Sequence, residues 1–490
     1  MKLRAVNLID FYKSGHIFQY PKDTKFVYAN FTPRSDKWAD GIVLKDFDHK
    51  VVWFGARGIA KWLLRDLWNE TFFSQPKHEV LAHYKRRMDS SLGEGAVPVE
   101  HIAALHDLGY LPVKVKALKE GFRVNMRVPV MTIINTDPKF FWLTNYLETQ
   151  LSNALWRPVT AATIAYEYRR LLDKWAVKTG SPSEFIPWQG HDFSYRGLPS
   201  PFDVMTGAGH LLSFTGTDTV PAIDFLEDYY GGTGFLGGSV PATEHSVMCA
   251  GMQDGEFETF RRLVEDVYPK GIISIVSDTW DFWKVVTQFT RKLKDAILKR
   301  EGKVVLRPDS GDPVKIICGD PSATPGSPEF KGAVECLWEI FGGTTTVTGY
   351  KLLDTHIGLI YGDSITLQRA QEILSGLSAK GFASGNIVFG IGSFTYQHNT
   401  RDTFGHAIKA TWCVVGGEHR PIFKDPKTDS GLKKSATGLL RVEREGNDFV
   451  LHDNQTGRGE LSGELETIFV DGILHNMQSY DEIRNLLGTF

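Results

Sequence analysis

Residues 304–311 read VVLRPDSG, a short apolar run that ends on an arginine, a proline and an aspartate. Runs of this kind, each closed by polar or glycine residues, recur through the second half of the chain, with helical patterns between most of them. None alternates cleanly between apolar and polar residues, which is typical of strands buried on both faces. The runs are His210–Phe214, Ile272–Val276, Val304–Leu306, Ile357–Tyr361 and Ile387–Phe389.

Strands separated by helices predict parallel β-α-β units. In folds built from such units, the functional groups lie at the carboxyl ends of the strands, which is where the polar residues of this chain gather. An open parallel sheet and an α/β barrel both satisfy the pattern. Because the five runs follow one another, we favour the barrel and predict an irregular, TIM-like α/β barrel with a second, β-rich domain.

The patterns divide the chain into four regions. A segment of the β-rich domain comes first, followed by a mostly helical region, the barrel, and a C-terminal segment that completes the β-rich domain. Pro158 should interrupt or restart the helix in which it falls. We expect the strand Lys25–Phe31 to pair with strands in residues 439–470. The regions are residues 1–55, 56–185, 186–415 and 416–490.

The composition argues against several classes of function. The chain has 490 residues, and 55 Lys+Arg against 58 Asp+Glu gives a net charge of −3, which disfavours a nucleic-acid or membrane-surface binder. The four cysteines are far apart and form no CxxC pair, so we expect neither a disulfide scaffold nor a zinc site. Because there is no signal-peptide core and no apolar run of bilayer length, we expect a cytoplasmic protein.

Charged residues follow the predicted strands. A single aspartate in such a place is more often a turn or capping residue. Four on separate strand ends would converge at a barrel mouth, where they could bind sugar hydroxyls, hold Mg²⁺ or accept from an amide. Most arginines are surface residues, but one directly after an apolar strand needs an anion or carbonyl partner. The aspartates are Asp218, Asp278, Asp309 and Asp363, and the arginines are Arg196, Arg307 and Arg401.

Three further features each allow more than one interpretation. The turn Gly390-Ile391-Gly392-Ser393 could cradle a phosphate with its N–H groups or be a plain strand-to-loop turn. His245 has an acidic neighbour and follows a glycine-rich stretch, so it could be an acid-base group, a nucleophile towards phosphoryl groups, or structural. Tyr12 and Phe193 could stack on a ligand, although most aromatic residues belong to the core.

As a set, these motifs resemble those of the nicotinate and nicotinamide phosphoribosyltransferase family (type II). Asp10–His16, DFYKSGH, is similar to the opening motif of the family, and matches follow in order over essentially the whole chain. Several look like the nicotinamide-specific members. The other matching segments are residues 141–149, 191–197, 214–219, 239–246, 276–278, 307–311, 349–351, 362–363, 400–402 and 423–426.

The resemblance implies a homodimer with shared active sites that joins nicotinamide to phosphoribosyl pyrophosphate. The pyridine ring would lie between Phe193 and Tyr12 of the partner subunit, with Asp10 in the same binding set. Asp218 would accept from the carboxamide, which favours nicotinamide over nicotinate, and Arg307 would donate to a neighbouring group. The residues implied for ribose, phosphate and pyrophosphate are Arg196, His245, Arg307, Asp309, Gly362, Asp363, Gly392, Ser393, Arg401, Lys409 and Lys424.

The chemistry is implied in the same way. The pyridine nitrogen would displace pyrophosphate from a ribosyl centre with oxocarbenium character, and Mg²⁺ would neutralise the leaving group. In this family ATP phosphorylates the active-site histidine; here that is His245, supported by Asp278, with Asp309 completing the catalytic set. The family commonly has three glycines where this chain has Gly392-Ser393-Phe394, a departure that could change the phosphate loop.

Two rival functions stay open at the level of sequence. A nicotinate phosphoribosyltransferase would run the same chemistry on the acid. A catalytically silent binding or signalling protein would share the fold, although it would not need the full set of charged residues at the strand ends. An aldolase or isomerase built on a barrel would require a Schiff-base lysine or a cluster of metal ligands, and neither stands out at a strand end.

Overall fold

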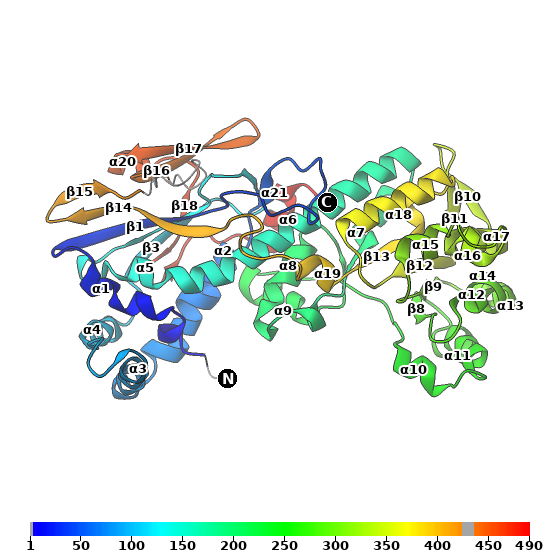
Figure 1. Ribbon diagram of the computed structural model, residues 1–490, viewed down its shortest axis with the longest axis horizontal. Helices are drawn as coiled ribbons and strands as arrows, with labels where there is room; N and C mark the ends of the chain where they lie inside the picture. Colours follow the sequence, from blue (N-terminus) through cyan, green and yellow to red (C-terminus); the bar gives the residue numbers. More distant parts are fainter. Residues whose placement is uncertain (1–2, 424–435) are drawn as a thin grey trace.

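The computed structural model describes residues 3–423 and 436–490, which form two lobes (Figure 1). One lobe is built on an antiparallel sheet that takes strands from both halves of the chain. The other is built on a curled parallel sheet with helices packed around it. The four regions proposed from the sequence stay a prediction.

Helix α6 (Glu148–Thr179) connects the two lobes. The side chain of its first residue pairs with Lys13 in the N-terminal segment at 2.5 Å, and the hydroxyl of its last residue donates to Ser384 beside the parallel sheet at 3.1 Å. The helix continues through Pro158, so the predicted interruption is wrong. Because 20 of its 32 residues are buried, tertiary packing outweighs the cost of about 3 kcal/mol that a proline imposes inside a helix.

Four of the five predicted strands lie in the parallel sheet. Its six strands follow the order β7-β6-β13-β12-β9-β8, and each neighbouring pair is parallel. This arrangement confirms the α/β class, and the six strands make a curled half-barrel. The strands are β6 (Gly190–Asp192), β7 (Gly216–Thr217), β8 (Ile273–Val276), β9 (Val304–Arg307), β12 (Ile357–Tyr361) and β13 (Val388–Ile391).

Helices between these strands in the sequence pack against the sheet. Their apolar side chains share one buried core with the strands, in which Leu337 and Leu374 join Leu306 and Leu359. Burial on both faces explains why the strands are apolar runs without alternation. The helices are α15 (Pro313–Cys318), α17 (Ala333–Phe341) and α18 (Leu367–Ala379).

The predicted strand His210–Phe214 is wrong. Residues up to Leu211 belong to helix α8 (Met205–Leu211), and the strand begins only at Gly216. Every residue of α8 is buried, and His210 inside it lies 2.7 Å from the Tyr396 hydroxyl. A short apolar run that is buried all round does not distinguish a helix from a strand, because neither periodicity is visible in it.

The antiparallel sheet has seven strands in the order β15-β14-β1-β5-β3-β18-β19. The N-terminal strand β1 pairs with β14 and β5, and β18 lies beyond β5 and β3. Direct pairing of Lys25–Phe31 with the C-terminal strands is therefore wrong, although β1 and β18 share a sheet. The strands are β1 (Thr24–Thr32), β3 (Val113–Ala117), β5 (Met131–Asn135), β14 (Ala407–Val415), β15 (Glu418–Pro421), β18 (Glu466–Val470) and β19 (Ile473–Leu474).

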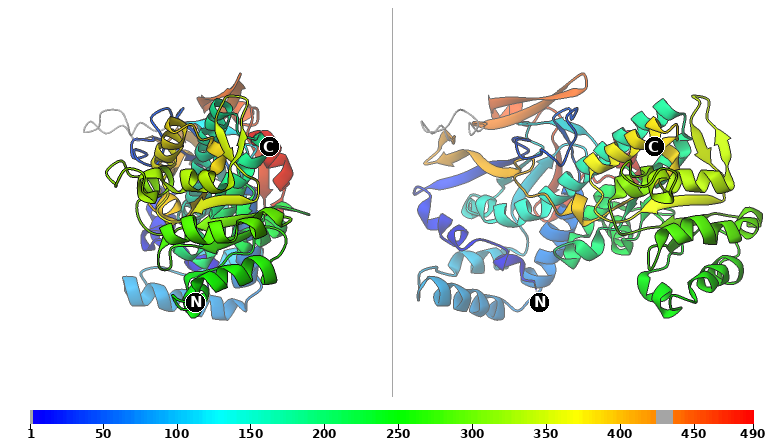
Figure 2. Two further views of the ribbon diagram at one scale, coloured as in Figure 1. Left: turned by 90° about the vertical axis from the view of Figure 1, so that its right-hand side faces the viewer. Right: turned by 45° about the vertical axis from the view of Figure 1, so that its right-hand side comes forward.

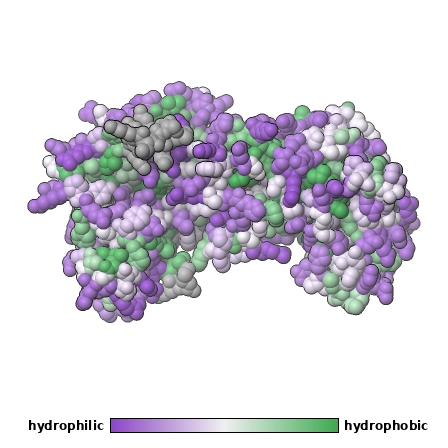
Figure 3. All heavy atoms as spheres, in the orientation of Figure 1, coloured by the Kyte–Doolittle hydropathy of each residue, from purple (hydrophilic) through white to green (hydrophobic). Residues whose placement is uncertain are grey.

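The molecule is elongated, and short helices project from both lobes. Figure 2 shows α10 (His245–Ala250) and α11 (Glu256–Arg262), in green, projecting from the parallel-sheet lobe. In Figure 3 the lower edge of the molecule is hollowed between these helices and α3 (Lys77–Leu92), and polar and apolar residues mix over the face. Within the part of the chain that the structure describes, no helix is both long enough and apolar enough to cross a membrane.

Candidate active site

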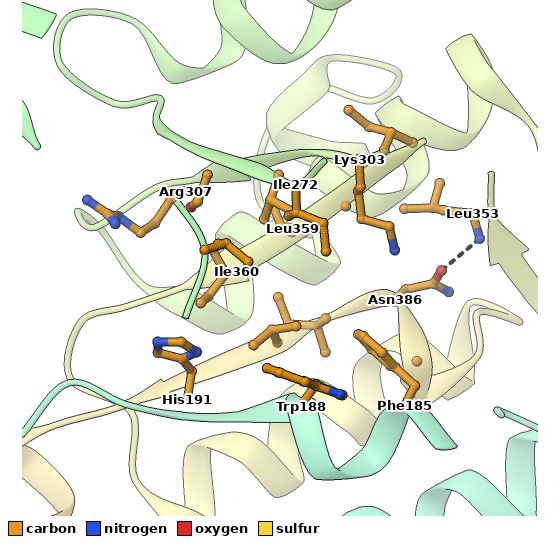
Figure 4. Close-up of a pocket in the computed structure, with 18 of the residues that line it drawn as sticks. Phe185, Trp188, His191, Ile272, Lys303, Arg307, Leu353, Leu359, Ile360 and Asn386 are labelled. Atoms are coloured by element: carbon orange, nitrogen blue, oxygen red, sulfur yellow. Dashed lines mark hydrogen bonds between the residues drawn. The ribbon is translucent and has the colours of Figure 1, made fainter. Parts of the chain in front are cut away.

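A cavity of about 470 Å³ lies within the curled parallel sheet. Figure 4 shows His191 and Arg307 at one end of it and Lys303 towards the other. Phe193 and Asp218 also line the cavity. The structure therefore brings together Phe193, Asp218 and Arg307, the three residues that we assigned to one pocket from the sequence.

The strands hold these three side chains at one edge of the sheet. Phe193 directly follows β6, and its N–H donates to the Ile391 carbonyl of β13 at 2.8 Å. Asp218 directly follows β7, and its N–H donates to the Asp192 carbonyl at 2.9 Å. Arg307 is the last residue of β9. Because carboxyl ends of parallel strands share an edge, residues far apart in sequence converge there.

The Asp218 carboxylate has two donors on one oxygen. His191 Nε2 lies 2.9 Å from Asp218 Oδ1, and the Ser239 hydroxyl donates to the same atom. Burial acts to raise the pKa of Asp218, but these two hydrogen bonds and the nearby Arg307 charge outweigh it, so the pKa is lowered. Asp218 therefore presents an ionised carboxylate to the cavity at neutral pH.

A chain of polar contacts runs from Arg307 to His245. Arg307 Nε is 3.5 Å from Asp309 Oδ2, and Arg307 Nη2 donates to the Thr243 carbonyl at 2.5 Å. The Asp309 N–H donates to Asp278 Oδ2 at 2.9 Å, and Asp278 Oδ1 lies 3.2 Å from His245 Nε2. The His245 side chain is 49% exposed while that of Asp278 is 5% exposed. A buried carboxylate thus orients an accessible imidazole, the arrangement expected of a reactive histidine.

Carboxylates crowd around Asp309. Its pKa is raised, first by burial and then by the charges of Asp278 and Asp363, against the opposing effects of Arg307 and His245. Gly362 allows the close approach, because a Cβ on Gly362 would lie 2.7 Å from Asp309 Oδ1. Such a group of oxygens suits a ligand that brings hydroxyl donors or positive charge.

Gly390 lies directly beneath the ring of Phe193. A Cβ on Gly390 would lie 2.6 Å from Phe193 Cδ2 and 2.7 Å from the Gly362 Cα. A side chain at Gly390 would therefore displace the Phe193 ring, and the glycine allows the ring its position.

Neither residue of the Gly392-Ser393 turn has a left-handed backbone conformation. Gly392 has a φ of −124°, and Ser393 begins the short helix α19 (Ser393–Tyr396). Replacement of a family glycine by Ser393 therefore imposes no left-handed conformation on a residue with a side chain. Gly197 packs against this turn, since a Cβ there would be 1.8 Å from Ser393 Oγ. The turn and the exposed Arg196 thus lie side by side.

Tyr12 and Asp10 lie on the antiparallel-sheet lobe. Tyr12 is 59% exposed, and Asp10 accepts a hydrogen bond from the Thr149 hydroxyl at 2.8 Å. Neither is among the described residues of one chain that line the cavity. The structure does not bring these two together with Phe193 within one subunit.

Basic residues cluster on the same lobe around Lys409 in β14. The pKa of Lys409 is lowered, first by desolvation, with Arg34, Lys13 and Arg401 adding repulsion against the attraction of Glu148. A group of cations held this closely is suited to binding phosphate. Lys424, which we assigned to the same task, lies outside the described residues.

A metal site made of protein side chains does not appear in residues 3–423 and 436–490. No three His, Cys, Asp or Glu side chains there are grouped to hold a metal ion. The carboxylates around Asp309 could contribute one or two oxygens to an ion whose other ligands came from a substrate.

Comparison with known proteins places the chain in a family. The sequence model of the nicotinate phosphoribosyltransferase (NAPRTase) family matches residues 188–462, more than half of the chain. A nicotinamide phosphoribosyltransferase from Acinetobacter baylyi is 61% identical over 494 residues, covering 99% of this chain and 97% of that protein. The chain belongs to the NAPRTase family.

More distant relatives agree with NAPRTase membership. A nicotinamide phosphoribosyltransferase from Mycoplasma pneumoniae is 34% identical over 450 residues, covering 87% of this chain and 93% of that protein. The crystal structure of nicotinate-nucleotide pyrophosphorylase from Pyrococcus furiosus matches with a TM-score of 0.60 and 15% identity, covering 99% of this chain and 94% of that one. At that identity the match shows a common fold.

Sequence reasoning missed three residues that contact or surround the candidate site residues. His191 and Ser239 contact Asp218, and Arg34 adds to the charge around Lys409. His191 and Ser239 fall inside matched segments, so the motifs could have marked them. Arg34 lies in a segment with no motif, and only the fold reveals its place.

Proposed function

We propose that this chain acts as a nicotinamide phosphoribosyltransferase, making nicotinamide mononucleotide and pyrophosphate from nicotinamide and phosphoribosyl pyrophosphate in NAD salvage. The observation that carries this proposal is the cavity shared by Phe193, Asp218 and Arg307. The Acinetobacter and Mycoplasma relatives, both nicotinamide phosphoribosyltransferases, support it.

The pyridine ring would stack on Phe193, whose position depends on the absence of a side chain at Gly390 beneath it. Asp218 would accept a hydrogen bond from the carboxamide NH₂. Nicotinate would instead bring a second carboxylate against an ionised one, at a cost of several kcal/mol as an order of magnitude. The lowered pKa of Asp218 supports this selection for the amide.

The ribosyl group would be transferred by displacement. The pyridine nitrogen forms a bond to the anomeric carbon as the bond from that carbon to pyrophosphate breaks, and pyrophosphate leaves with the electron pair. Arg307, Arg196 and His245 would face the departing diphosphate. Asp309 and Asp363 would bind ribose hydroxyls beside the positive charge that develops on the sugar, which their own charge favours.

Two lobes of different subunits would complete each site. Gly392 and Ser393 would receive the 5′-phosphate in one chain. Tyr12, Asp10 and the basic residues around Lys409 lie on the other lobe of the chain, so they would serve the cavity of a partner subunit in a homodimer. The exposure of Tyr12 supports this arrangement.

Mg²⁺ is proposed as a companion of the substrate. The oxygens of Asp309 and Asp363 are of the kind that Mg²⁺ prefers, and the diphosphate would supply most of the remaining ligands. Bound there, the ion would neutralise charge on the leaving pyrophosphate.

ATP is proposed to phosphorylate His245 and thereby improve the driving force. Nε2 of His245 lies against Asp278, which leaves Nδ1 as the nitrogen able to form the bond to the γ-phosphorus while ADP leaves with the electron pair of the broken bond. The exposed imidazole and its buried carboxylate partner support this role.

Labelling with γ-³²P-ATP should therefore leave acid-labile phosphate on the wild-type chain and none on His245→Ala. The exposed His398, beside the Phe394 ring and outside this contact network, provides a matched control as His398→Ala. Equal labelling of His245→Ala and the wild type would contradict the phosphohistidine.

The function itself is tested by product identification. The chain is incubated with phosphoribosyl pyrophosphate, Mg²⁺ and either nicotinamide or nicotinate, with and without ATP, and the nucleotide formed is identified by mass. We expect nicotinamide mononucleotide as the main product. Preferential formation of nicotinate mononucleotide, or no nucleotide at all, would overturn the proposal.

We also propose that the parallel sheet closes into an irregular barrel. The edge strands β7 and β8 are each joined to the segment 238–242, by isolated parallel bridges between Gly216 and Gly238 and between Ala242 and Ser274. This segment would serve as the strand that closes the wall. Closure would account for a cavity enclosed by residues of nearly every strand.

A further inference from the structure

His191 and Phe193 point into the same cavity from one strand. They are two residues apart on and just after β6 and both line the cavity, as the alternation of an extended chain requires. Asp192, between them, points the other way and accepts from the Ser194 N–H at 2.9 Å. The strand thus delivers an imidazole next to the aromatic face that would hold a pyridine.

The imidazole has a fixed position. Its ring centroid is 4.8 Å from that of Phe193, at an interplanar angle of 49°. On another side it meets the backbone of β7, since a Cβ on Gly216 would be 2.7 Å from His191 Nδ1. Only 8% of His191 is exposed. A ring confined in this way can hold its partner in one orientation.

That partner is Asp218. An ionised carboxylate only accepts hydrogen bonds, so the 2.9 Å contact requires a proton on His191 Nε2, which donates to Asp218 Oδ1. The Ser239 hydroxyl donates to the same oxygen. Among the described residues none donates to Oδ2, and the Asp218 side chain is 42% exposed. One oxygen is therefore anchored to the protein and the other is available to a ligand.

We propose that His191 is a positioning residue that sets the preference for nicotinamide over nicotinate, by anchoring Asp218 Oδ1 so that Oδ2 meets the carboxamide as an ionised acceptor. This inference rests on the proposed function. It adds a specificity-determining residue that does not itself touch the reacting atoms. Loss of the anchor frees the carboxylate to turn away and removes a donor that stabilises its charge.

The test compares His191→Leu with His191→Gln. Glutamine can place an amide N–H near the position of Nε2, whereas leucine fills similar space without a donor. A hydrogen bond to a charged group contributes about 1.5–3 kcal/mol, so we expect His191→Leu to lower the ratio of kcat/KM for nicotinamide over nicotinate by about 10- to 150-fold. His191→Gln should stay within about threefold of the wild-type ratio.

A pH profile separates this role from a structural one. The ionisable groups with the largest effects on the pKa of Asp218 are His191 on β6 and Arg307 on β9. Because the contact with His191 helps to lower the pKa of Asp218, its removal should let the carboxylate take up a proton at higher pH. In His191→Leu the preference for nicotinamide should therefore disappear at a higher pH on acidification than in the wild type.

The possible outcomes are distinct. An active wild type whose ratio survives in His191→Leu, or falls equally in the leucine and glutamine variants, overturns the inference alone. A wild type that makes no nicotinamide mononucleotide overturns both the proposed function and the inference. If His191→Leu does not fold, His191→Ala assayed with added imidazole takes its place. Recovery of the wild-type preference for nicotinamide then supports the hydrogen bond from His191 to Asp218. Failure of imidazole to restore the preference in folded His191→Ala overturns the inference.

Discussion

Asp218→Asn should lower the preference for nicotinamide over nicotinate by about 100- to 1,000-fold. The substitution keeps the shape of the side chain but removes the negative charge that, under the proposed function, faces the ring substituent. Nicotinate then meets an amide that can donate to its carboxylate, while nicotinamide loses a charged acceptor. Because a like-charge contact in a partly buried site costs several kcal/mol, its removal should dominate the change.

The measurement is kcat/KM for each substrate at saturating phosphoribosyl pyrophosphate and Mg²⁺. Asp320→Asn is the matched control, since Asp320 is also an acid with a lowered pKa, held by Ser322 and Lys315 in an exposed turn and not among the residues that line the cavity. The control should keep the wild-type ratio. If Asp218→Asn leaves the ratio of kcat/KM for nicotinamide over nicotinate unchanged, Asp218 does not recognise the carboxamide.

Arg307→Ala should lower kcat/KM for phosphoribosyl pyrophosphate by about 1,000-fold. The Arg307 side chain is 11% exposed, and its guanidinium donates to the Thr243 carbonyl and lies 3.5 Å from Asp309 Oδ2. Its loss removes a cation from the diphosphate and leaves Asp309 without its nearest opposite charge. Arg307→Lys restores the charge but not the planar fork, so we expect an intermediate fall of about 100-fold.

Arg300→Ala is the control for the loss of a buried arginine. Arg300 is 6% exposed, and its guanidinium donates to the carbonyls of Val264 and Gly271, outside the cavity lining. Its removal should lower the melting temperature but leave kcat/KM of the folded enzyme nearly unchanged. Equal kinetic losses in Arg300→Ala and Arg307→Ala would show that the effect reflects packing rather than diphosphate binding.

The parallel sheet could be predicted because the composition of its strands reflects their burial. Runs such as Ile272–Val276 and Ile357–Tyr361 are apolar on both faces and stop at polar residues, as buried parallel strands do. The same logic placed Arg307 at the end of β9. Asp218 also lies at that edge, but the strand before it is β7 rather than the predicted run His210–Phe214. Convergence of strand ends follows from topology, so it needed no knowledge of side-chain contacts.

Other elements left no local signal. Strand β6 spans only Gly190–Asp192 and contains two polar residues, so there is no apolar run from which it could be predicted. Pairing of β1 with β14 joins residues nearly 400 positions apart, and composition does not encode such a partner. His191 was missed for a related reason: a lone histidine is uninformative until the fold places an acid beside it.

The unbroken course of α6 through Pro158 has a mechanical consequence. At about 1.5 Å per residue, the 32 residues of this helix form a rigid rod of about 48 Å whose ends are fastened to Lys13 and Ser384. One inserted residue would turn everything beyond it by about 100° and advance it by about 1.5 Å. The length of α6 therefore sets the spacing between the two lobes of one chain, from the N-terminal segment that contains Lys13 to the parallel sheet beside Ser384.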